Sequence, residues 1–493
     1  MGYDQPQQPR DYGGWRLRHG IGLFGLGTAG TIGVLAALLV LIITAAADPV
    51  ALLYVAPPVL AGGGLALARV RGEPLALAAL RRARWHHAAS RGYTRYRADV
   101  VAEHSPAYPL PGVLAPLTLL DAEDGYGGRY GIVLDRRTGT MTATLRVIPA
   151  SPWLADRADA DGWVANWGGW LSSLGYLPAV RWVTVTIDTA PEPGTALADA
   201  VAAALDPAAP LPARQIMGQL AAAAPAAAAD VDTRVSITFD PSAAPSALPG
   251  VTGAAAETAR MLHGLESALG TCGVTVLGRA SAAEIAGTVR TASDPASRGE
   301  VNRLLAQPAA ALSWGEAGPV GAAEEPGCYR HDGGISMTWC WREAPRQTVT
   351  SDVLARLVAP GAWPKRVSVQ YRPLPAAEAT RVLQAEVSAA QFREVYRRRT
   401  GRDETARDSA DQARARQAAA EEAAGAGVGL ISVYVTVTVT RDADLPRAAA
   451  ETEAAAESSK IRLRPMTFSQ AAGWATTLPC GICPADLARR MPH

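Results

Sequence analysis

Residues 21–47, IGLFGLGTAGTIGVLAALLVLIITAAA, form an apolar run that contains no charged side chain. After Asp48 comes a second uncharged run, PVALLYVAPPVLAGGGLALA, over residues 49–68. A membrane's hydrocarbon core is about 30 Å thick and takes about 20 helical residues to cross. Both runs are long enough for this, and Asp48-Pro49 leaves room only for a tight turn. The sequence therefore predicts a transmembrane helical hairpin over residues 21–70.

The charges around these runs predict an orientation. Residues 1–98 carry a net charge of +7 and the remaining residues −6, although the whole chain is close to neutral at +1. Because cytoplasmic flanks are rich in Arg and Lys, we expect both termini in the cytoplasm and a multi-pass protein of the inner (plasma) membrane. Residues 1–20 are then a basic cytoplasmic N-terminus, and residues 71–104 a basic juxtamembrane helix. The arginines concerned are Arg10, Arg16, Arg18, Arg69, Arg71, Arg81, Arg82 and Arg84.

Two other interpretations of the N-terminus stay open. Thr44–Asp48 could end a cleaved secretory signal, because small residues alternate there as they do at a cleavage site. The apolar core is longer than signal sequences use, and a second run follows it directly. The two runs could also be buried helices of a soluble protein, although Pro57-Pro58 and Gly62–Gly64 are unusual inside such a helix.

The rest of the chain predicts a mixed α+β fold. Thr140–Val147 alternates in polarity as a half-buried strand does, and Leu430–Thr440 alternates Val with Thr. Trp163, Trp167 and Trp170 share one face of an expected helix. We expect residues 292–333 to be a loop and about 375–424 to be a long helical stretch. Two regions follow from this pattern, an α+β cytoplasmic domain over 105–345 and an α+β C-terminal subdomain with a long helical hairpin over 346–493.

The search for catalytic or ligand-binding motifs assigns no catalytic, cofactor-binding or metal-binding residue. Neither lysine, Lys365 or Lys460, lies in the glycine-rich loop that holds nucleotide phosphates. Near-neutral charge argues against a dedicated nucleic-acid-binding protein. Cys480 and Cys483 could be half a zinc site, a redox pair or two incidental cysteines. No cofactor is expected.

Two charged clusters have a structural and a functional interpretation. Asp156, Asp159 and Asp161 are typical of an acidic turn at a helix N-terminus. They are also the best candidates for the clustered titratable groups of an enzyme. The basic run Arg393–Arg399 is typical of a solvated helix face, and a contact with a partner or nucleic acid is the alternative.

Short motifs along the chain resemble a known family. Tyr12–Arg16 and Gly20–Leu26 are similar to the start of an actinobacterial family of hairpin-anchored proteins from conjugative elements, whose hairpin resembles the PrgI-type subunit of type IV secretion channels. Leu110–Leu117 and Leu119–Asp121 resemble that family's entry into its cytoplasmic domain. Residues 376–480 are similar in layout to the motor-less N-terminal domain of VirB-type conjugation ATPases, although Cys480 follows Leu478-Pro479 where a glycine is expected.

This resemblance implies a non-enzymatic inner-membrane subunit of a type IV (conjugation-like) secretion channel. Such a subunit would anchor and dock a separate secretion ATPase. Its partners would be the membrane, that ATPase and other channel subunits, in an oligomeric complex that meets nucleic acid only indirectly. Two alternatives stay open, a membrane subunit of a type VII (ESX) secretion machine and a membrane-tethered enzyme of unknown type.

Overall fold

The computed structural model divides into two compact units, each described here by itself. The first unit holds the described residues of Thr94–Ala376 and Ala426–His493, and the second those of Gly14–Tyr93 and Ala377–Gly425. The structure describes residues 28–70, 73–98, 108–125, 127–150, 155–192, 195–223, 229–246, 248–307, 310–345, 347–375, 378–385, 416–420 and 427–490.

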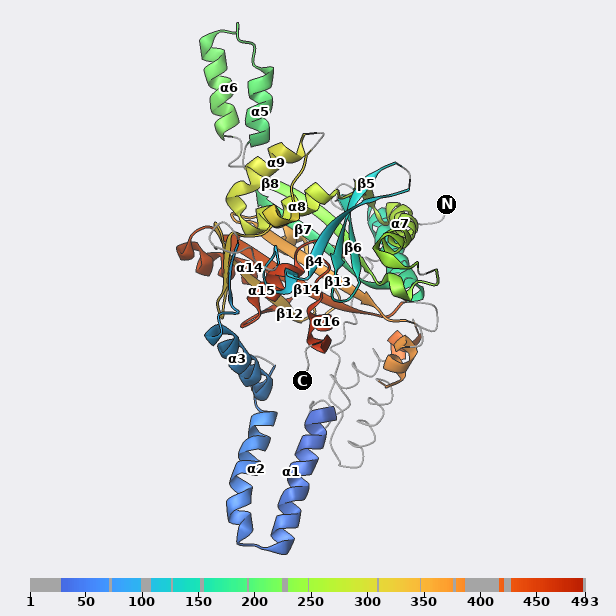
Figure 1. Ribbon diagram of the computed structural model, residues 1–493, viewed down its shortest axis with the longest axis vertical. Helices are drawn as coiled ribbons and strands as arrows, with labels where there is room; N and C mark the ends of the chain where they lie inside the picture. The colour runs from blue at the N-terminus through green and yellow to red at the C-terminus, as the bar shows by residue number, and fades with distance from the viewer. Residues whose placement is uncertain are drawn as a thin grey trace, which may run out of the picture. The chain divides into compact units, whose positions relative to one another are not determined.

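The second unit contains two apolar helices that pack against each other, α1 (Thr28–Ala47) and α2 (Ala51–Leu67). Asp48 closes the turn between them, because its Oδ1 accepts a hydrogen bond from the Val50 amide at 2.8 Å. A two-residue strand pair, β1 (Arg69–Val70) and β2 (Glu73–Pro74), leads into α3 (Leu75–Ser90). The order of helix, tight turn and helix therefore agrees with the sequence pattern (Figure 1).

The membrane-spanning character expected of this hairpin is contradicted. Over the residues that the structure describes, no helix combines the length and the apolarity needed to cross a membrane. The 17 residues of α2 rise only about 26 Å, less than the hydrocarbon core of about 30 Å. The prediction of a transmembrane hairpin over 21–70 is thus wrong. The membrane assignment and the multi-pass inner-membrane location with both termini in the cytoplasm are contradicted with it.

The first unit is α+β and is built on one large antiparallel sheet. Over the described residues this sheet has 13 strands, with β9 and β15 pairing at its sides to β6 and β12. In spatial order its main path is β3 (Arg95–Arg97), β10 (Gly321–Glu324), β11 (Tyr329–His331), β12 (Gly334–Glu343), β14 (Gly429–Val439), β13 (Lys365–Pro373), β7 (Val180–Pro191), β8 (Ala229–Phe239), β6 (Met141–Pro149), β5 (Arg129–Asp135) and β4 (Leu117–Glu123). The two side strands are β9 (Val274–Arg279) and β15 (Arg462–Pro465).

Valines in register build the centre of the sheet. Val185 of β7 lies opposite Val235 of β8 on one side and opposite Val369 of β13 on the other. β13 continues this pattern into β14, where Val369 faces Val433. β-Branched side chains suit a pleated surface, and their alternation with Thr, Ser and other polar residues gives these strands one apolar and one polar, hydroxyl-rich face.

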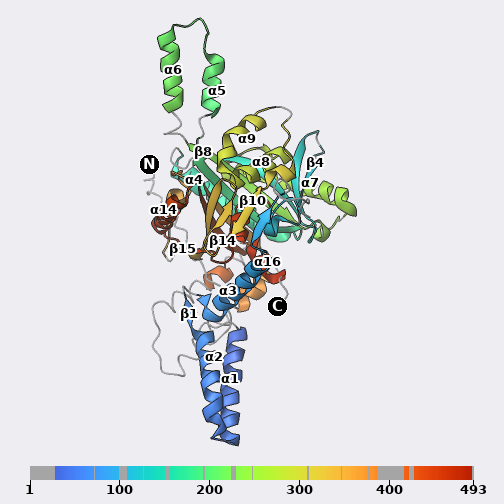
Figure 2. The same ribbon diagram turned by 60° about the vertical axis from the view of Figure 1, so that its left-hand side comes forward.

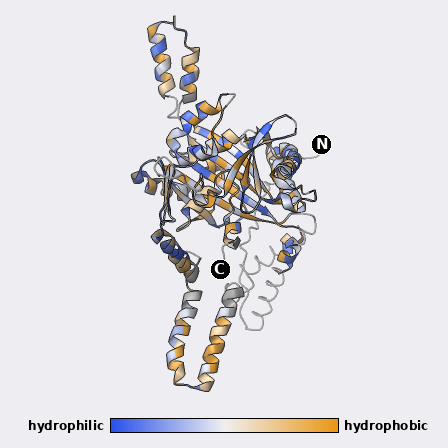
Figure 3. Ribbon diagram, in the orientation of Figure 1, coloured by the Kyte–Doolittle hydropathy of each residue, from blue (hydrophilic) through white to orange (hydrophobic). Residues whose placement is uncertain are grey.

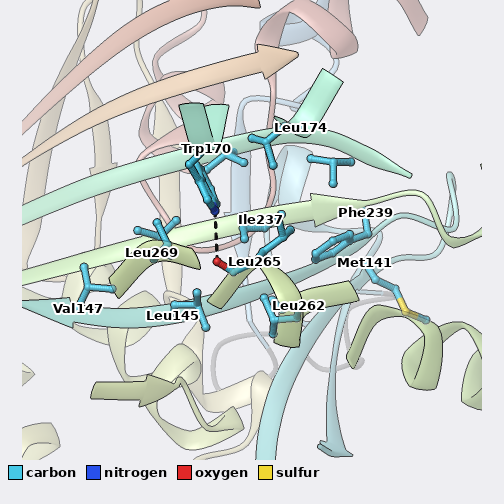
Figure 4. Close-up of a cluster of buried hydrophobic side chains, with 14 of the residues drawn as sticks. Met141, Leu145, Val147, Trp170, Leu174, Ile237, Phe239, Leu262, Leu265 and Leu269 are labelled. Atoms are coloured by element: carbon cyan, nitrogen blue, oxygen red, sulfur yellow. Dashed lines mark hydrogen bonds between the residues drawn. The ribbon is translucent and has the colours of Figure 1, made fainter. Parts of the chain in front are cut away.

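Helices cover the apolar face. α4 (Arg157–Ser173) and α7 (Gly250–Leu269) pack on β5 to β8, and α11 (Ala355–Val358) and α14 (Leu445–Ser458) pack on β13 and β14. Figure 4 shows Trp170 of α4 inside the first of these clusters, with its indole Nε1 donating to the Leu265 carbonyl of α7 at 3.2 Å. The helix predicted from the three tryptophans is therefore confirmed, and Trp170 is its most deeply buried member.

The hydroxyl face is buried as well, which the sequence pattern did not predict. α8 (Ala282–Ser293), α15 (Gln470–Thr476) and the chain that follows α15 toward α16 (Pro484–Arg490) lie against it. Its hydroxyls bond one another across the strands, as buried polar groups must. The pairs are Thr142–Thr238, Thr144–Ser236, Thr186–Ser368, Ser336–Thr438 and Thr338–Thr436, all at 2.8–2.9 Å. The strand expected at 140–147 is present as β6, but the expectation that it is half-buried is wrong, because Thr142 and Thr144 are both buried.

One region differs more strongly from expectation. The loop predicted over 292–333 contains α9 (Arg298–Leu305), α10 (Trp314–Ala317), β10 and β11. Its sequence is rich in Gly, Pro and Glu. Its short strands are held by pairing with other segments, since β10 pairs with β3 and β11 pairs with β12. Most of the helical stretch predicted over 375–424 lies outside the described residues.

Candidate functional site

A helical hairpin between β7 and β8 is the strongest candidate for an interaction site in the first unit. It consists of α5 (Thr195–Ala204) and α6 (Leu211–Ala223), which pack against each other. Both views show it standing away from the sheet, with α9 at its base (Figures 1 and 2). β7 and β8 are neighbouring antiparallel strands, so a short turn would suffice to join them. The chain places two helices there instead.

The connection between the two helices is locally determined. Asp206 Oδ1 accepts a hydrogen bond from the Ala208 amide at 2.8 Å, and its carbonyl accepts one from the Ala209 amide at 3.0 Å. Aspartate favours such turns because its side chain bonds the backbone two residues on. Pro210 and Pro212 bracket the first residue of α6, where proline is tolerated since the first turn leaves its amides unbonded.

The base of the hairpin is attached to α9 by an ion pair. Arg303 donates to both carboxylate oxygens of Asp199, Nε to Oδ2 at 2.6 Å and Nη2 to Oδ1 at 3.2 Å. The hydrogen bond from Arg303 lowers the pKa of Asp199. Both side chains are about half exposed, so this pair orients the hairpin more than it stabilises the fold.

A buried ionic network holds α9 on the sheet. Arg298 pairs with Asp230 at 2.8 Å and with Asp188 at 3.4 Å, and Arg234 pairs with Asp188 at 3.1 Å. Burial disfavours the ionised form of Asp188, but the adjacent Arg234 and Arg298 outweigh it and keep the Asp188 pKa below its usual value. Asp188 therefore remains an anion between two arginines. Through α9, the network gives the base of the hairpin a rigid support.

Large apolar side chains lie exposed along the hairpin, most of them on α6. Figure 3 shows apolar positions on both helices, and the relative exposure of Leu211 and Leu220 is 58% and 59%. A shallow groove of about 370 Å³ runs between the helices and is lined by Val201, Leu205 and Met217 among others. The exposed set is Leu197, Leu211, Ile216, Met217 and Leu220.

The chemistry of this surface suits the burial of a partner's apolar side chains. Its ionisable side chains are Asp199, Asp206 and Arg214, and interface cores are depleted in charge and enriched in methionine. Alanines between the larger side chains allow a partner helix to approach closely, because they add little bulk. Residues 195–223 thus carry exposed apolar side chains with few charges among them.

The two cysteines near the C-terminus lie inside the hydroxyl face of the sheet. Cys480 and Cys483 are both buried, and burial raises the pKa of the Cys480 thiol to about 12 and raises that of Cys483. Both are free thiols. Among the residues that the structure describes, no three His, Cys, Asp or Glu side chains are grouped so that they could hold a metal ion. In the described part of the chain, Cys480 and Cys483 are thus buried side chains of the core.

The acidic cluster singled out from the sequence lies at the start of α4. Asp156 precedes α4, where its carbonyl accepts from the amides of Asp159 and Ala160. Asp159 lies in the first turn of the same helix, which agrees with an acidic helix N-terminus. The basic run Arg393–Arg399 lies outside the described residues.

Sequence reasoning missed a buried histidine. His331 of β11 lies between the Ser293 carbonyl, 2.5 Å from Nδ1, and the Ser336 hydroxyl, 2.7 Å from Nε2. Burial lowers its pKa to about 4, so the ring is neutral at physiological pH. The Tyr-Arg-His strand is only three residues long inside a region expected to be a loop, and no periodicity marks it.

Comparison with known proteins adds no relative to this picture. The chain matches no model of a known protein family and no curated protein at a significant level. The geometry of the α5–α6 hairpin and the resemblance of the short motifs are therefore the basis for a functional proposal.

Proposed function

We propose that this chain is a non-enzymatic docking subunit of a type IV (conjugation-like) secretion machine, and that it binds a separate secretion ATPase through the α5–α6 hairpin. The observation that carries the proposal is the exposure of Ile216 and Leu220, one turn apart on α6, in a hairpin whose base contacts α9. Adjoining exposed apolar side chains on a helix that stands away from the sheet favour a protein-binding site.

The choice of partner rests on the resemblance of Tyr12–Leu26, Leu110–Asp121 and residues 376–480 to a conjugation family. A protein of that kind would work beside a separate motor, since neither lysine of this chain lies in a nucleotide-binding loop. Other channel subunits would join the same complex, and nucleic acid would be met only through them.

Co-purification of the tagged full chain from cells that naturally express it tests the proposal. We expect a VirB-type ATPase among the bound proteins, identified by mass spectrometry. Recovery of a type VII ATPase would replace the type IV assignment with the type VII alternative. Recovery of neither ATPase would refute the docking function, and turnover of a small-molecule substrate by the purified chain would favour an enzyme.

A double variant locates the contact. Ile216→Ser with Leu220→Ser removes apolar area worth about 2 kcal/mol of binding, or about a thirtyfold weaker Kd, because each side chain is about half exposed before docking. Ile148→Ser with Leu277→Ser is the matched control, since these side chains are exposed to a similar extent on β6 and β9. Equal ATPase recovery with both double variants would show that the hairpin is not the docking site.

A further inference from the structure

A second recessed surface lies in the first unit, in a cleft of about 640 Å³ beside α9. Val301 and Leu304 of α9 form one wall. Leu312, Pro319 and Val320 also line it. The cleft is thus largely apolar within, and large enough to accept several side chains of another protein.

Arg290 of α8 also lines the cleft, with its charge already compensated. Its Nη1 donates to Asp332 at 3.1 Å and to the Gly318 carbonyl at 3.3 Å, and its Nη2 donates to Asp294 at 3.2 Å. Two carboxylates therefore neutralise one guanidinium and leave an excess of negative charge. An anionic ligand would have to displace these ion pairs.

Two further carboxylates stand at the rim. Glu300 on α9 and Glu316 on α10 both line the cleft and are exposed. Glu316 uses Oε2 to accept the Ser313 amide at 2.8 Å, which caps α10. The hydrogen bonds from Ser313 lower the Glu316 pKa, so this carboxylate stays ionised down to acidic pH. An apolar interior below an acidic rim favours a ligand that is both apolar and basic.

α9 connects this cleft to the hairpin. Its residue Arg303 pairs with Asp199 of α5, while Glu300, Val301 and Leu304 of the same helix line the cleft. α9 has eight residues, about 12 Å at 1.5 Å per residue. A protein seated on the hairpin therefore has the cleft within reach.

We propose that this cleft binds a basic amphipathic segment of the protein that docks on the α5–α6 hairpin. Apolar side chains of the segment contact Val301, Leu304 and Leu312, and its Arg or Lys side chains pair with Glu300 and Glu316. This inference rests on the proposed docking function for the identity of the partner. The binding chemistry of the cleft is independent of it.

Fluorescence anisotropy with a synthetic probe tests the cleft without the ATPase. The probe is a fluorescein-labelled helical peptide in which pairs of Leu alternate with pairs of Arg, and the comparison peptide carries Glu in place of Arg. We expect the full chain to bind the basic peptide and not the acidic one. Binding should weaken with added salt, since exposed charge pairs are screened.

A charge-removing variant locates the binding. Glu300→Gln with Glu316→Gln should weaken binding of the basic peptide about tenfold, and the glutamine introduced on α10 can still cap that helix. Glu123→Gln with Glu451→Gln removes the same charge from β4 and α14 and should bind as the wild type does. The proposal is overturned if both double variants weaken binding equally, or if Glu300→Gln with Glu316→Gln leaves binding unchanged. It is also overturned if the wild-type chain binds the acidic peptide as well as the basic one. If the wild-type chain binds the basic peptide but recovers no ATPase from cells, only the docking function is refuted.

Discussion

The buried network around Asp188 gives the sharpest prediction about stability. Asp188 has a side-chain exposure of 5% and pairs with Arg234, which is also 5% exposed, at 3.1 Å. Its other oxygen pairs with Arg298 at 3.4 Å. The substitution Asp188→Asn keeps the shape of this side chain and removes its charge.

The expected loss is large because the arginines stay buried. Arg234 would keep one ion pair, with the partly exposed Asp232 at 2.6 Å, and a hydrogen bond to the Thr288 hydroxyl at 3.3 Å. Arg366 is also buried, and Asp188 helps to hold its charge, since burial lowers the Arg366 pKa to about 10 while Asp188 raises it. Removing one partner of a buried ion pair costs about 3–5 kcal/mol, because it leaves an uncompensated charge. We expect the free energy of unfolding to fall by about that amount.

Urea unfolding followed by tryptophan fluorescence measures this change. Asp199→Asn is the matched control, since it breaks an exposed Asp–Arg pair and should leave the midpoint nearly unchanged. The folded-state pKa of Asp188 is depressed, so its contribution is present above the unfolded pKa of about 3.9 and is lost as the pH falls through the folded value. Below about pH 4 the Asn variant should therefore lose less stability than the wild type. A loss under about 1 kcal/mol, or one equal to that of Asp199→Asn, would refute the reasoning.

Three further predictions test other parts of the first unit. At Gly481, φ is +66° and an added Cβ would overlap Oγ1 of Thr142. At Gly139, φ is +72° but no atom lies near an added Cβ, so Gly139→Ala should cost only about 1 kcal/mol. Gly481→Ala should therefore lower the free energy of unfolding at least twice as much as Gly139→Ala. Calorimetry on both variants decides this, and equal losses would contradict it. Burial lowers the His331 pKa to about 4, so the unfolded chain binds more protons than the folded one. As the pH falls from about 6.5 to 4, the free energy of unfolding should therefore drop by about 1 kcal/mol per pH unit. His331→Gln should flatten that slope in urea titrations, and an unchanged slope would contradict this prediction. The Cys480 thiol, with its pKa raised to about 12 by burial, should react with Ellman's reagent only after unfolding in guanidinium chloride, and rapid reaction in the native protein would contradict its placement.

Local pattern was enough to predict several elements. Polarity alternation marked β6 and β14, and helical spacing of tryptophans marked α4. These features depend on a residue's near neighbours, which the sequence displays directly. The candidate site was less visible, because an Ala-rich helix has the same sequence pattern whether it is buried or stands free. Only the packing shows that Ile216 and Leu220 lack a cover within the first unit.

Long-range placement explains the failures of prediction. Asp188 and Arg298 are 110 residues apart in sequence and share one ion pair, and the short strands β10 and β11 exist because they pair with other segments.

The sequence by itself determined the α+β character, the turn at Asp48 and the elements β6, β14 and α4, because these follow from local periodicity and turn chemistry. The tertiary structure decided the rest. A strand that alternates Val and Thr has two distinguishable faces, but its sequence does not say what covers each face. Here α8, α15 and the segment holding Cys480 bury the hydroxyls that would otherwise meet water. Likewise an apolar run does not fix how many of its residues become helical, and α2 has only 17; over the described residues the membrane hairpin predicted for 21–70 is contradicted.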